Sequence, residues 1–512
     1  MVKWSNEAEA HLACVGSVRL YYPQPMELQL PTAPPPADTP PWPLHERLDW
    51  LKAFTRQIIT HERALTAAIC ADVGKPEWQA LTGDVMTLLA ACKWYRKNAR
   101  RVLRERAVGR VWAFLPGTRA VIRHYPMGTV AIIATWNYPV QLLGIQLLQA
   151  LLAGNRVIVK PSERAPASQG LLLDLAVRAG LPAGRLTWTR ATREHGPALL
   201  QAHEQGKVRL DHVVFTGSTA VGRQIALWGA QQLVSTTLEL SGNDSAIVLA
   251  DADLALAARS IFAALTLNSG QTCLAPRRVL VDERVYAPFV AELEALLTKT
   301  RGDGAGDGVI GRALAVIDHA SAQRCDSMAR DAIAQGGREL APAEVSAGDV
   351  PGGGGPGFVT YPARVIVDCP PGCDLATSAS CEHFGPVLAV LPVRDEAHLL
   401  RLHASCTQHL LTSIFSRDAS VVGQAWALVP KLVERGSGGV SINDCVVPGG
   451  HPGIGITGHG RSGWGTSRGA DGLLALTRPV AITVTGWPRL PVGPIAPAML
   501  ARMRSGLRWM FG

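Results

Sequence analysis

The chain has 512 residues, of which 47% are hydrophobic and 18% charged, and its formal net charge is +9. A chain of this length and apolar content can bury a large core, which excludes a wholly disordered protein, a collagen and a disulfide-stapled miniprotein. No stretch approaches the roughly 20 uninterrupted apolar residues of a membrane span, and the polar N-terminus does not have the pattern of a secretory signal. We therefore expect a cytoplasmic protein whose ten cysteines are free thiols.

The first part of the chain changes character twice. Seven prolines within residues 31–43 predict an extended linker, so residues 1–43 form an N-terminal extension. Helical periodicity follows from residue 44 to about residue 106. Residues 111–124 alternate weakly around Pro116-Gly117, which is compatible with a β-hairpin.

From residue 128 onward, strand and helix patterns alternate. The first alternation has strands at 128–136, 156–160 and 211–215 and helices at 142–153 and 168–179. The second has strands at 245–249, 277–281, 363–367 and 387–391. A surface loop must lie within the glycine-rich residues 303–358. Such alternation predicts an α/β fold with parallel sheets covered on both faces.

Three side chains combine a reactive group with a suitable setting. Cys273 follows a polar turn, where a thiol can have a lowered pKa and act as a nucleophile. Glu239 lies between two leucines at a strand end, where burial would raise its pKa toward that of a general base. Asn137 ends the strand at 128–136, so its amide could donate to an oxyanion. The structural alternatives are a buried small side chain, a salt-bridged or capping carboxylate and a helix cap, respectively.

Two segments have the composition of a nucleotide site. Gly217-Ser-Thr-Ala-Val-Gly222 follows a strand and opens a helix, whose free N–H groups can bind phosphate. Its spacing is neither the G-x-G-x-x-G fingerprint nor a P-loop, because Arg223 stands where a lysine would bind phosphate. A tight turn is therefore the alternative. Lys160 and Glu163 follow the strand at 156–160 and can bind ribose hydroxyls.

Taken together and in order, these segments resemble the motif series of the aldehyde dehydrogenase superfamily, namely TWNYP, KPSE, FTGSTAVG, LELSGND, GQTCLAP, EHFGPV and SGGVSIND…GHGRSGWG. The resemblance runs from about residue 44 to about residue 484 and is strongest to the class 3 branch, which acts on fatty and aromatic aldehydes. It implies NAD(P)-dependent oxidation of an aldehyde to a carboxylic acid through a thiohemiacetal and a thioester on a cysteine. By analogy with class 3, it also implies a homodimer.

The resemblance further implies a Rossmann-like cofactor domain, a catalytic domain and a small β bridging element. We expect the dinucleotide-binding domain at 44–110 and 125–238, the catalytic domain at 239–435, the bridging and oligomerisation element at 111–124 and 440–484, and a basic apolar tail at 485–512.

Carried over residue by residue, the resemblance assigns a role to each motif position. Cys273 is the nucleophile, Asn137 the oxyanion-hole amide and Glu239 the base that activates the deacylating water. Seven cofactor contacts are implied: Lys160 and Glu163 at the adenine ribose, Gly217, Ser218 and Gly222 at the pyrophosphate, and Glu382 and Phe384 at the nicotinamide. NAD is favoured because Glu163 would repel a 2′-phosphate, although Lys160 leaves NADP open.

The chain departs from the family pattern at two notable places. Ser241 stands where glycine is usual, and residues 455–463 lack the phenylalanine of the family's PFGGxGxSG segment. These departures support one rival hypothesis, a catalytically weak homologue acting as a binding or scaffold subunit. A CoA-acylating dehydrogenase is the other rival, and Glu239 argues against it because CoA transfer needs no base to activate water.

Charge and metal signals outside the motifs are weaker. Residues 92–110 carry eight basic residues and one acid, which predicts a solvated helix face and leaves nucleic acid a minor hypothesis. The basic, amphipathic stretch 499–512 predicts a subunit or domain contact, with a peripheral membrane contact as the alternative. The cysteines and histidines near residues 369–383 lack a second tight pair, so no metal site is expected.

Overall fold

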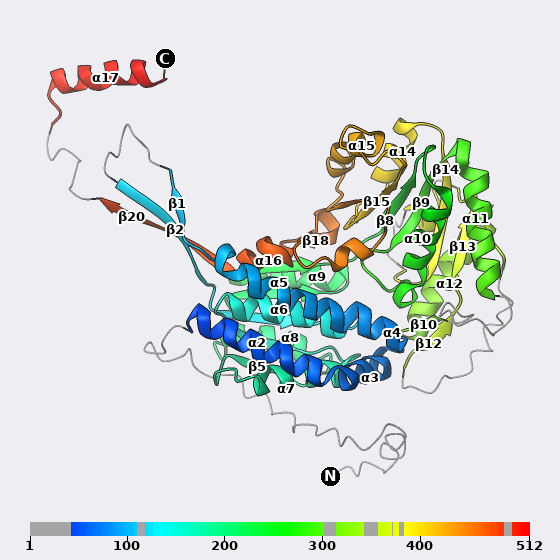
Figure 1. Cartoon of the computed structure of the whole chain (residues 1–512), viewed down its shortest axis with the longest axis horizontal. Coiled ribbons are helices and arrows are strands. Elements are labelled where there is room, and N and C mark those ends of the chain that lie inside the picture. Colours follow the sequence, from blue (N-terminus) through cyan, green and yellow to red (C-terminus); the bar gives the residue numbers. More distant parts are fainter. Residues whose placement is uncertain are drawn as a thin grey trace, which may run out of the picture.

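Two large sheets, each with helices on both sides, make up the body of the molecule (Figure 1). The computed structural model describes residues 42–109, 118–301, 314–342, 357–370, 372–377, 383–485 and 494–511. The predicted proline-rich extension therefore lies almost wholly outside the described residues. The α/β fold with parallel sheets is confirmed.

The helical pattern that begins at residue 44 is confirmed, but it ends earlier than predicted. The helices are α2 (Leu44–Thr60), α3 (Glu62–Val73), α4 (Glu77–Gln79), the π-helical η2 (Ala80–Met86) and α5 (Thr87–Val102). Beyond α5 the chain forms β1 (Arg106–Val108), which pairs antiparallel with β2 (Thr118–Pro126). The hairpin thus starts before residue 111, and Pro116-Gly117 lies outside the described residues. The basic run accordingly divides between an exposed face of α5 and the exposed strand β1.

The first sheet has six strands in the order β18-β7-β6-β3-β4-β5. Five are parallel: β3 (Thr129–Ile133), β4 (Arg156–Lys160), β5 (Leu186–Trp188), β6 (His212–Thr216) and β7 (Ser235–Glu239). The sixth, β18 (Gly463–Trp464), joins β7 antiparallel. Because β3 lies between β4 and β6, the strand order reverses there, and such a switch point opens a crevice at the carboxyl ends of the strands.

Helices cover both faces of this sheet because β3 is apolar on both sides. Val130 and Ile132 belong to one core cluster, whereas Ala131 and Ile133 belong to another. The connecting helices are α6 (Pro139–Leu152), α7 (Pro166–Arg178), α8 (His195–Glu204) and α9 (Thr219–Gln232). Helix α6 begins three residues earlier than the predicted 142–153, because the side chain of Asp84 accepts hydrogen bonds from its first free N–H groups.

The second sheet has seven strands in the order β11-β13-β14-β9-β8-β15-β16, of which only β11 runs antiparallel to its neighbour in this described sheet. Its strands are β8 (Asp244–Val248), β9 (Pro276–Asp282), β11 (Arg338–Glu339), β13 (Arg364–Val367), β14 (Val387–Val393), β15 (Thr412–Phe415) and β16 (Val440–Ile442). Its helical elements are α10 (Leu254–Thr266), η3 (Leu267–Gly270), α11 (Glu283–Arg301), α12 (His319–Ala334), α13 (Asp374–Thr377), α14 (Glu396–Ala404) and α15 (Gln424–Val433).

The glycine-rich stretch 303–358 contains more structure than the predicted loop. Helix α12 lies within it, preceded by β10 (Leu314–Val316), which pairs with β12 (Val359–Tyr361). Residues 302–313 and 343–356 are outside the described residues.

The end of the chain returns to the first sheet and then leaves the body. The small elements there are η4 (Val447–Gly450), β17 (Ile456–Thr457), η5 (Gly460–Ser462), β19 (Thr466–Ser467) and α16 (Gly469–Ala475). Strand β20 (Thr477–Thr485) pairs with β2 along its whole length, and the resulting ribbon projects from the body (Figure 1). In helix α17 (Pro497–Phe511), every residue from Pro497 to Trp509 except Gly506 is exposed. No helix in the described ranges is long and apolar enough to cross a membrane.

Candidate active site

Residues 268–273, here named the cysteine loop, have an unusual backbone. Asn268, Ser269 and Gly270 follow one another with φ values of +49°, +56° and +69°. Left-handed conformations are costly for residues other than glycine, so the surrounding contacts must hold them. The Asn268 N–H donates to Gln79 Oε1 at 2.7 Å, and its Nδ2 donates to the Asn137 carbonyl at 2.8 Å. The loop is therefore fixed from the side of the first sheet.

Arg277 fixes the same loop from the side of the second sheet. Its fully buried guanidinium donates to the carbonyls of Gly270 at 2.6 Å, Thr272 at 3.0 Å and Gly385 at 3.3 Å. Gly270 itself must be glycine, because a Cβ there would lie 2.6 Å from the Gly385 carbonyl. Sequence reasoning missed Arg277, whose position in a strand gives no sign of these partners.

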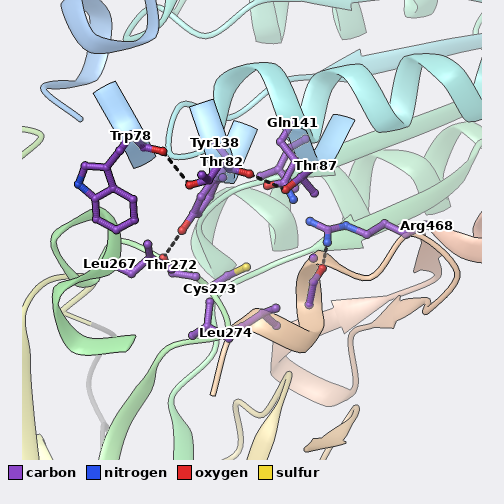
Figure 2. Close-up of a pocket in the computed structure, with 15 residues that line it drawn as sticks. Trp78, Thr82, Thr87, Tyr138, Gln141, Leu267, Thr272, Cys273, Leu274 and Arg468 are labelled. Carbon is purple, nitrogen blue, oxygen red and sulfur yellow. Dashed lines mark hydrogen bonds between the residues drawn. The ribbon is translucent and has the colours of Figure 1, made fainter. Parts of the chain in front are cut away.

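Cys273 lines a cavity of about 290 Å³ between the two sheets (Figure 2). Its side chain is partly exposed, unlike an inert buried cysteine. Tyr138 and Thr272 share a hydrogen bond of 2.8 Å between their hydroxyls, which ties the cysteine loop to the start of α6. Trp78 and Leu267 line one part of the cavity, and Arg468 lines another.

Asn137 lies against the cysteine loop. Its side chain is 3% exposed, and its Nδ2 donates to the Gln271 carbonyl at 3.1 Å. The helix-cap alternative does not hold, because Asp84 rather than Asn137 accepts from the first N–H groups of α6. The Asn137 amide therefore contacts the backbone of the loop that leads to Cys273.

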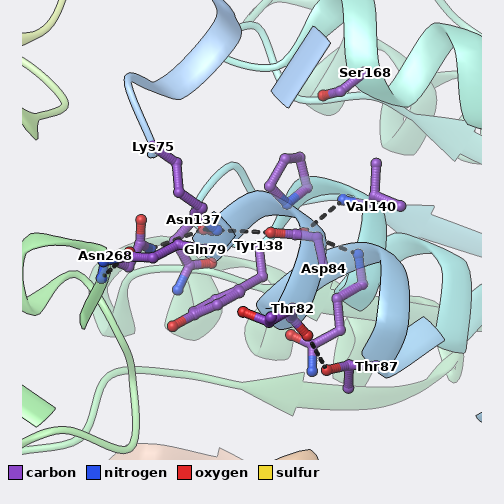
Figure 3. Close-up of polar contacts among 12 residues, drawn as sticks. Lys75, Gln79, Thr82, Asp84, Thr87, Asn137, Tyr138, Val140, Ser168 and Asn268 are labelled. Atoms are coloured by element: carbon purple, nitrogen blue, oxygen red, sulfur yellow. Dashed lines mark hydrogen bonds and ion pairs between the residues drawn. The ribbon is translucent and has the colours of Figure 1, made fainter. Parts of the chain in front are cut away.

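A buried ion pair between Lys75 and Asp84 contacts the backbone of Asn137 (Figure 3). Lys75 Nζ lies 2.7 Å from Asp84 Oδ2, with both side chains fully buried, and donates to the Asn137 carbonyl at 2.9 Å. The same ammonium lies 3.9 Å from the centroid of the Tyr138 ring. Burial lowers the pKa of Lys75, and Asp84 opposes that shift. Sequence reasoning missed this pair, although an acid beside the apolar Val85 in a helical pattern was an available signal.

Glu239 ends β7 and is 7% exposed. Burial raises its pKa to about 7, while Arg468 and a hydrogen bond with Thr216 oppose the shift. Within the described part of the chain its Oε1 has no hydrogen-bond partner and no ion pair involves it, so the salt-bridge alternative does not hold. A carboxylate in this state can accept a proton near neutral pH.

The carboxyl ends of the neighbouring strands carry the predicted nucleotide contacts. Lys160 ends β4, Glu163 follows it, and the two side chains form an ion pair of 2.6 Å. Burial raises the pKa of Glu163, but the hydrogen bond from Lys160, a backbone hydrogen bond and the charges of Lys160 and Arg193 together outweigh it and hold that pKa below its usual value. Gly217 follows β6, and Ser218 caps α9 by accepting from the Val221 N–H at 3.4 Å.

These residues fit a dinucleotide. Helix α9 opens at the strand-order reversal, and its first N–H groups have no acceptor within the helix, so they can bind a pyrophosphate. The Lys160–Glu163 pair offers a donor and an acceptor to ribose hydroxyls. Gly222 also packs closely, because a Cβ there would lie 2.3 Å from the Leu240 side chain, and its pyrophosphate contact stays a prediction.

Comparison with known proteins decides the family. The profile described as "Aldehyde dehydrogenase family" matches residues 37–482. The chain belongs to the aldehyde dehydrogenase family. It oxidises aldehydes to carboxylic acids with NAD or NADP.

Named relatives come from several sources. The chain is 34% identical over 454 residues to 4,4'-diapolycopene aldehyde oxidase of Methylomonas sp, covering 88% of this chain and 80% of that protein. It is 31% identical over 427 residues to the mitochondrial succinate-semialdehyde dehydrogenase of Arabidopsis thaliana, covering 82% and 75%. The crystal structure of an NAD-dependent aldehyde dehydrogenase from Sinorhizobium meliloti superposes with a TM-score of 0.77 at 25% identity, covering 89% and 86%.

The second sheet contributes one more predicted contact of this dehydrogenase. Phe384 has a φ of +50°, and its ring packs edge-on against Trp136 with centroids 5.8 Å apart. The Arg277 guanidinium lies 5.6 Å from the Phe384 ring centroid. Phe384 thus bridges the two sheets beside the cysteine loop. Glu382, the other predicted nicotinamide contact, lies outside the described residues.

The two departures from the family pattern are accommodated. Ser241 does not adopt a positive φ, so it carries no left-handed strain. The crowded position is Gly242, where a Cβ would lie 2.6 Å from the Cys273 carbonyl. The cavity does not depend on residues 455–463, because Val446 and Leu274 supply apolar lining. Among the described residues no cluster of three or more His, Cys, Asp or Glu could hold a metal ion.

Proposed function

We propose that Cys273, Asn137 and Glu239 are the residues through which the chain oxidises its aldehyde. The observation that carries this proposal is the cysteine loop, which is held against the Asn137 amide at a cavity large enough for a small substrate. Glu239 at the end of β7 adds a buried carboxyl group with a pKa of about 7.

The chemistry follows from these three groups. The Cys273 thiolate attacks the aldehyde carbon, and the carbonyl oxygen takes the negative charge while accepting hydrogen bonds from Asn137 Nδ2 and the Cys273 N–H. The hydride that leaves the substrate carbon would go to the dinucleotide when it is bound, and the carbonyl that re-forms leaves a thioester on Cys273. Glu239 then takes a proton from a water molecule whose oxygen attacks the thioester, and the thiolate leaves as the carboxylic acid forms.

NAD is the cofactor we propose, with Lys160 and Glu163 at the adenine ribose, Gly217, Ser218 and Gly222 at the pyrophosphate, and Glu382 and Phe384 at the nicotinamide. The preference for NAD is supported by the negative charge of Glu163. Glu163 is held ionised by Lys160, and an ionised carboxylate would repel the 2′-phosphate that distinguishes NADP. Comparing the Kd values of NAD and NADP by fluorescence titration tests this preference.

Hydrolysis rather than CoA transfer is the proposed fate of the thioester, because a buried carboxylate poised near neutral pH serves water and is superfluous for a thiol acceptor. The purified chain would be given NAD and a panel of medium-chain and aromatic aldehydes in ¹⁸O water, with and without CoA. We expect NADH release without CoA and a free carboxylic acid that carries ¹⁸O from the water. Turnover that requires CoA would contradict the proposal, and no turnover with any aldehyde would favour the scaffold alternative.

We also propose that the chain is a cytoplasmic homodimer and that it divides into domains as predicted. We further propose that it is related to the class 3 branch, and this relation rests on sequence motifs alone. The support for a dimer is the projecting ribbon, in which β20 is an edge strand with most of its residues exposed. A reducing compartment is supported by the free thiols among the described residues, namely Cys70, Cys92, Cys325, Cys369, Cys406 and Cys445. Native mass spectrometry of the full chain tests the dimer.

A peripheral membrane contact through α17 is the last part of the proposal. Within the described residues this helix exposes Met499, Leu500, Met503 and Leu507 and also carries Arg502, Arg504 and Arg508, with no acidic residue. An exposed apolar face flanked by basic side chains suits an anionic lipid surface. We expect the full chain, but not a variant lacking residues 494–512, to sediment with phosphatidylserine vesicles. Equal sedimentation of both would contradict it.

A further inference from the structure

Arg468 lines the same cavity as Cys273 but belongs to no predicted motif position (Figure 2). It lies between β19 and α16, with a φ of +66°, and is 5% exposed. Its Nη1 donates to the Gly449 carbonyl, whereas its Nε has no partner within the described part of the chain. No described carboxylate lies within ion-pair distance of its guanidinium.

A buried cation without an acidic partner is expensive to keep, and so is a left-handed backbone at a residue other than glycine. Arg468 combines these two unfavourable features, and it lines the same cavity as Cys273. Four titratable groups interact electrostatically with Arg468, namely Glu239 on β7, Cys273 before β9, Tyr95 on α5 and Tyr138 before α6. Burial lowers the pKa of Arg468, and these four groups oppose that shift. Two of the four must lose a proton for the proposed reaction to run.

We propose that Arg468 is an electrostatic positioning residue of the reaction centre, whose charge keeps Cys273 as a thiolate and Glu239 as a carboxylate. This inference rests on the roles proposed above for those two residues. A fixed cation in a site shielded from water favours the anionic form of each neighbour. It also offers a counter-charge to the carboxylate that the reaction releases beside Cys273.

Two other roles would explain the same position. Arg468 could act only as a structural clamp, through its hydrogen bond to Gly449. It could instead bind a carboxylate at the far end of the substrate, as a semialdehyde would require. Neither of these two roles predicts a change in the reactivity of the thiol in the absence of substrate, whereas the electrostatic role does.

The test is the pH dependence of Cys273 alkylation by iodoacetamide, a neutral reagent, in the full chain without aldehyde or dinucleotide. Modification is read at the Cys273 peptide by mass spectrometry, because iodoacetamide can also react with other thiols such as that of Cys70. Arg468→Gln keeps a hydrogen-bond donor for Gly449 but loses the charge, whereas Arg468→Lys keeps the charge. Arg63→Gln is the matched control, because its side chain is 96% exposed.

Removing the cation disfavours the thiolate, so the pKa that governs alkylation should rise. We expect Arg468→Gln to shift the profile upward by about one pH unit, which slows alkylation about tenfold at pH 7. Arg468→Lys should stay within about threefold of the wild type, and Arg63→Gln should not differ from it. Thermal denaturation identifies any variant that has not folded.

Several outcomes would overturn the inference. An unchanged alkylation profile in folded Arg468→Gln would exclude the electrostatic role and leave the clamp or the substrate tail. If Arg468→Gln does not fold, the test rests on Arg468→Lys, which keeps the charge. A shift of its alkylation profile by a full pH unit would contradict a role for that charge. Unchanged alkylation with a selective loss of turnover on 5-oxopentanoate but not on pentanal would assign Arg468 to the substrate tail. The assay needs no turnover, so it is independent of whether Cys273→Ala abolishes oxidation, which tests the proposed function itself.

Discussion

The two sheets contribute to the site from opposite ends of their strands. The first sheet supplies Asn137, Lys160, Gly217 and Glu239 at or just beyond the carboxyl ends of its parallel strands, where α/β sheets ordinarily place function. The second sheet supplies Cys273 three residues before β9 begins, at the amino end of the strand. The nucleophile therefore lies where the fold offers no ready-made crevice.

The difference shows in how each group is held. Asn137 and Glu239 are positioned by strand ends that the sheet itself fixes. The cysteine loop instead needs consecutive left-handed residues and a buried arginine on its carbonyls. A nucleophile on a specially built loop and a base on an ordinary strand end should respond differently to substitution.

Removing the nucleophile has the largest expected effect. Cys273→Ala leaves no group that can form the thioester, so NADH production from any aldehyde should fall by about 10⁴-fold or more. The measurement is absorbance at 340 nm, and Cys70→Ala, which removes another half-buried thiol, should retain activity. Residual turnover in Cys273→Ala within tenfold of the wild type would assign the chemistry elsewhere.

Removing the base from the first sheet comes next. Glu239→Gln cannot accept the water proton, so turnover limited by deacylation should fall by about 10²–10⁴-fold. With the pKa of Glu239 at about 7, its carboxylate form grows as pH rises through 7, so the wild-type rate should climb there and level off in alkali. The variant should lack this climb, while the exposed Glu204→Gln should keep it. A wild-type rate that falls as pH rises through 7 would contradict the role.

Breaking the ion pair behind Asn137 tests how much the first sheet depends on support. Asp84→Asn leaves the Lys75 ammonium buried without its counter-charge, which should lower the free energy of unfolding by about 3–5 kcal/mol. Urea denaturation measures the loss. Asp174→Asn removes the partner of a half-exposed pair with Arg178 and should cost less than about 1 kcal/mol. Equal losses in the two variants would show that the buried pair has no special weight.

The oxyanion donor should have the smallest effect of the four. Asn137→Ala removes one hydrogen bond to the developing charge, so kcat should fall by about 10²–10³-fold. Cys273 should still react with iodoacetamide as in the wild type, since the loop keeps its contacts with Arg277. Asn98→Ala on α5 is the matched control. A rise in KM with unchanged kcat would indicate substrate binding rather than oxyanion stabilisation.

What could be predicted from the sequence follows the same division. Alternating patterns mark strand ends, so the placement of Asn137 and Glu239 was predictable, and their catalytic roles stay predictions. The supports of the site were not predictable, because each joins segments far apart in the chain. Arg277 reaches Gly385 and Lys75 reaches Asn137, and neither contact leaves a local pattern. Helix α12 was missed because the glycines on either side of it dominate that stretch.

The antiparallel strand β18 has a consequence for the order in which the protein is made. Glu239 pairs with Gly463, so the edge strand that carries the base has no neighbour on that side until the C-terminal part of the chain has emerged. At about 5–20 residues per second, the ribosome needs on the order of ten seconds or more to travel between them. During that interval the nascent chain can build the nucleotide crevice but not a finished reaction centre. A truncated product released early is thereby left without a completed site beside its base.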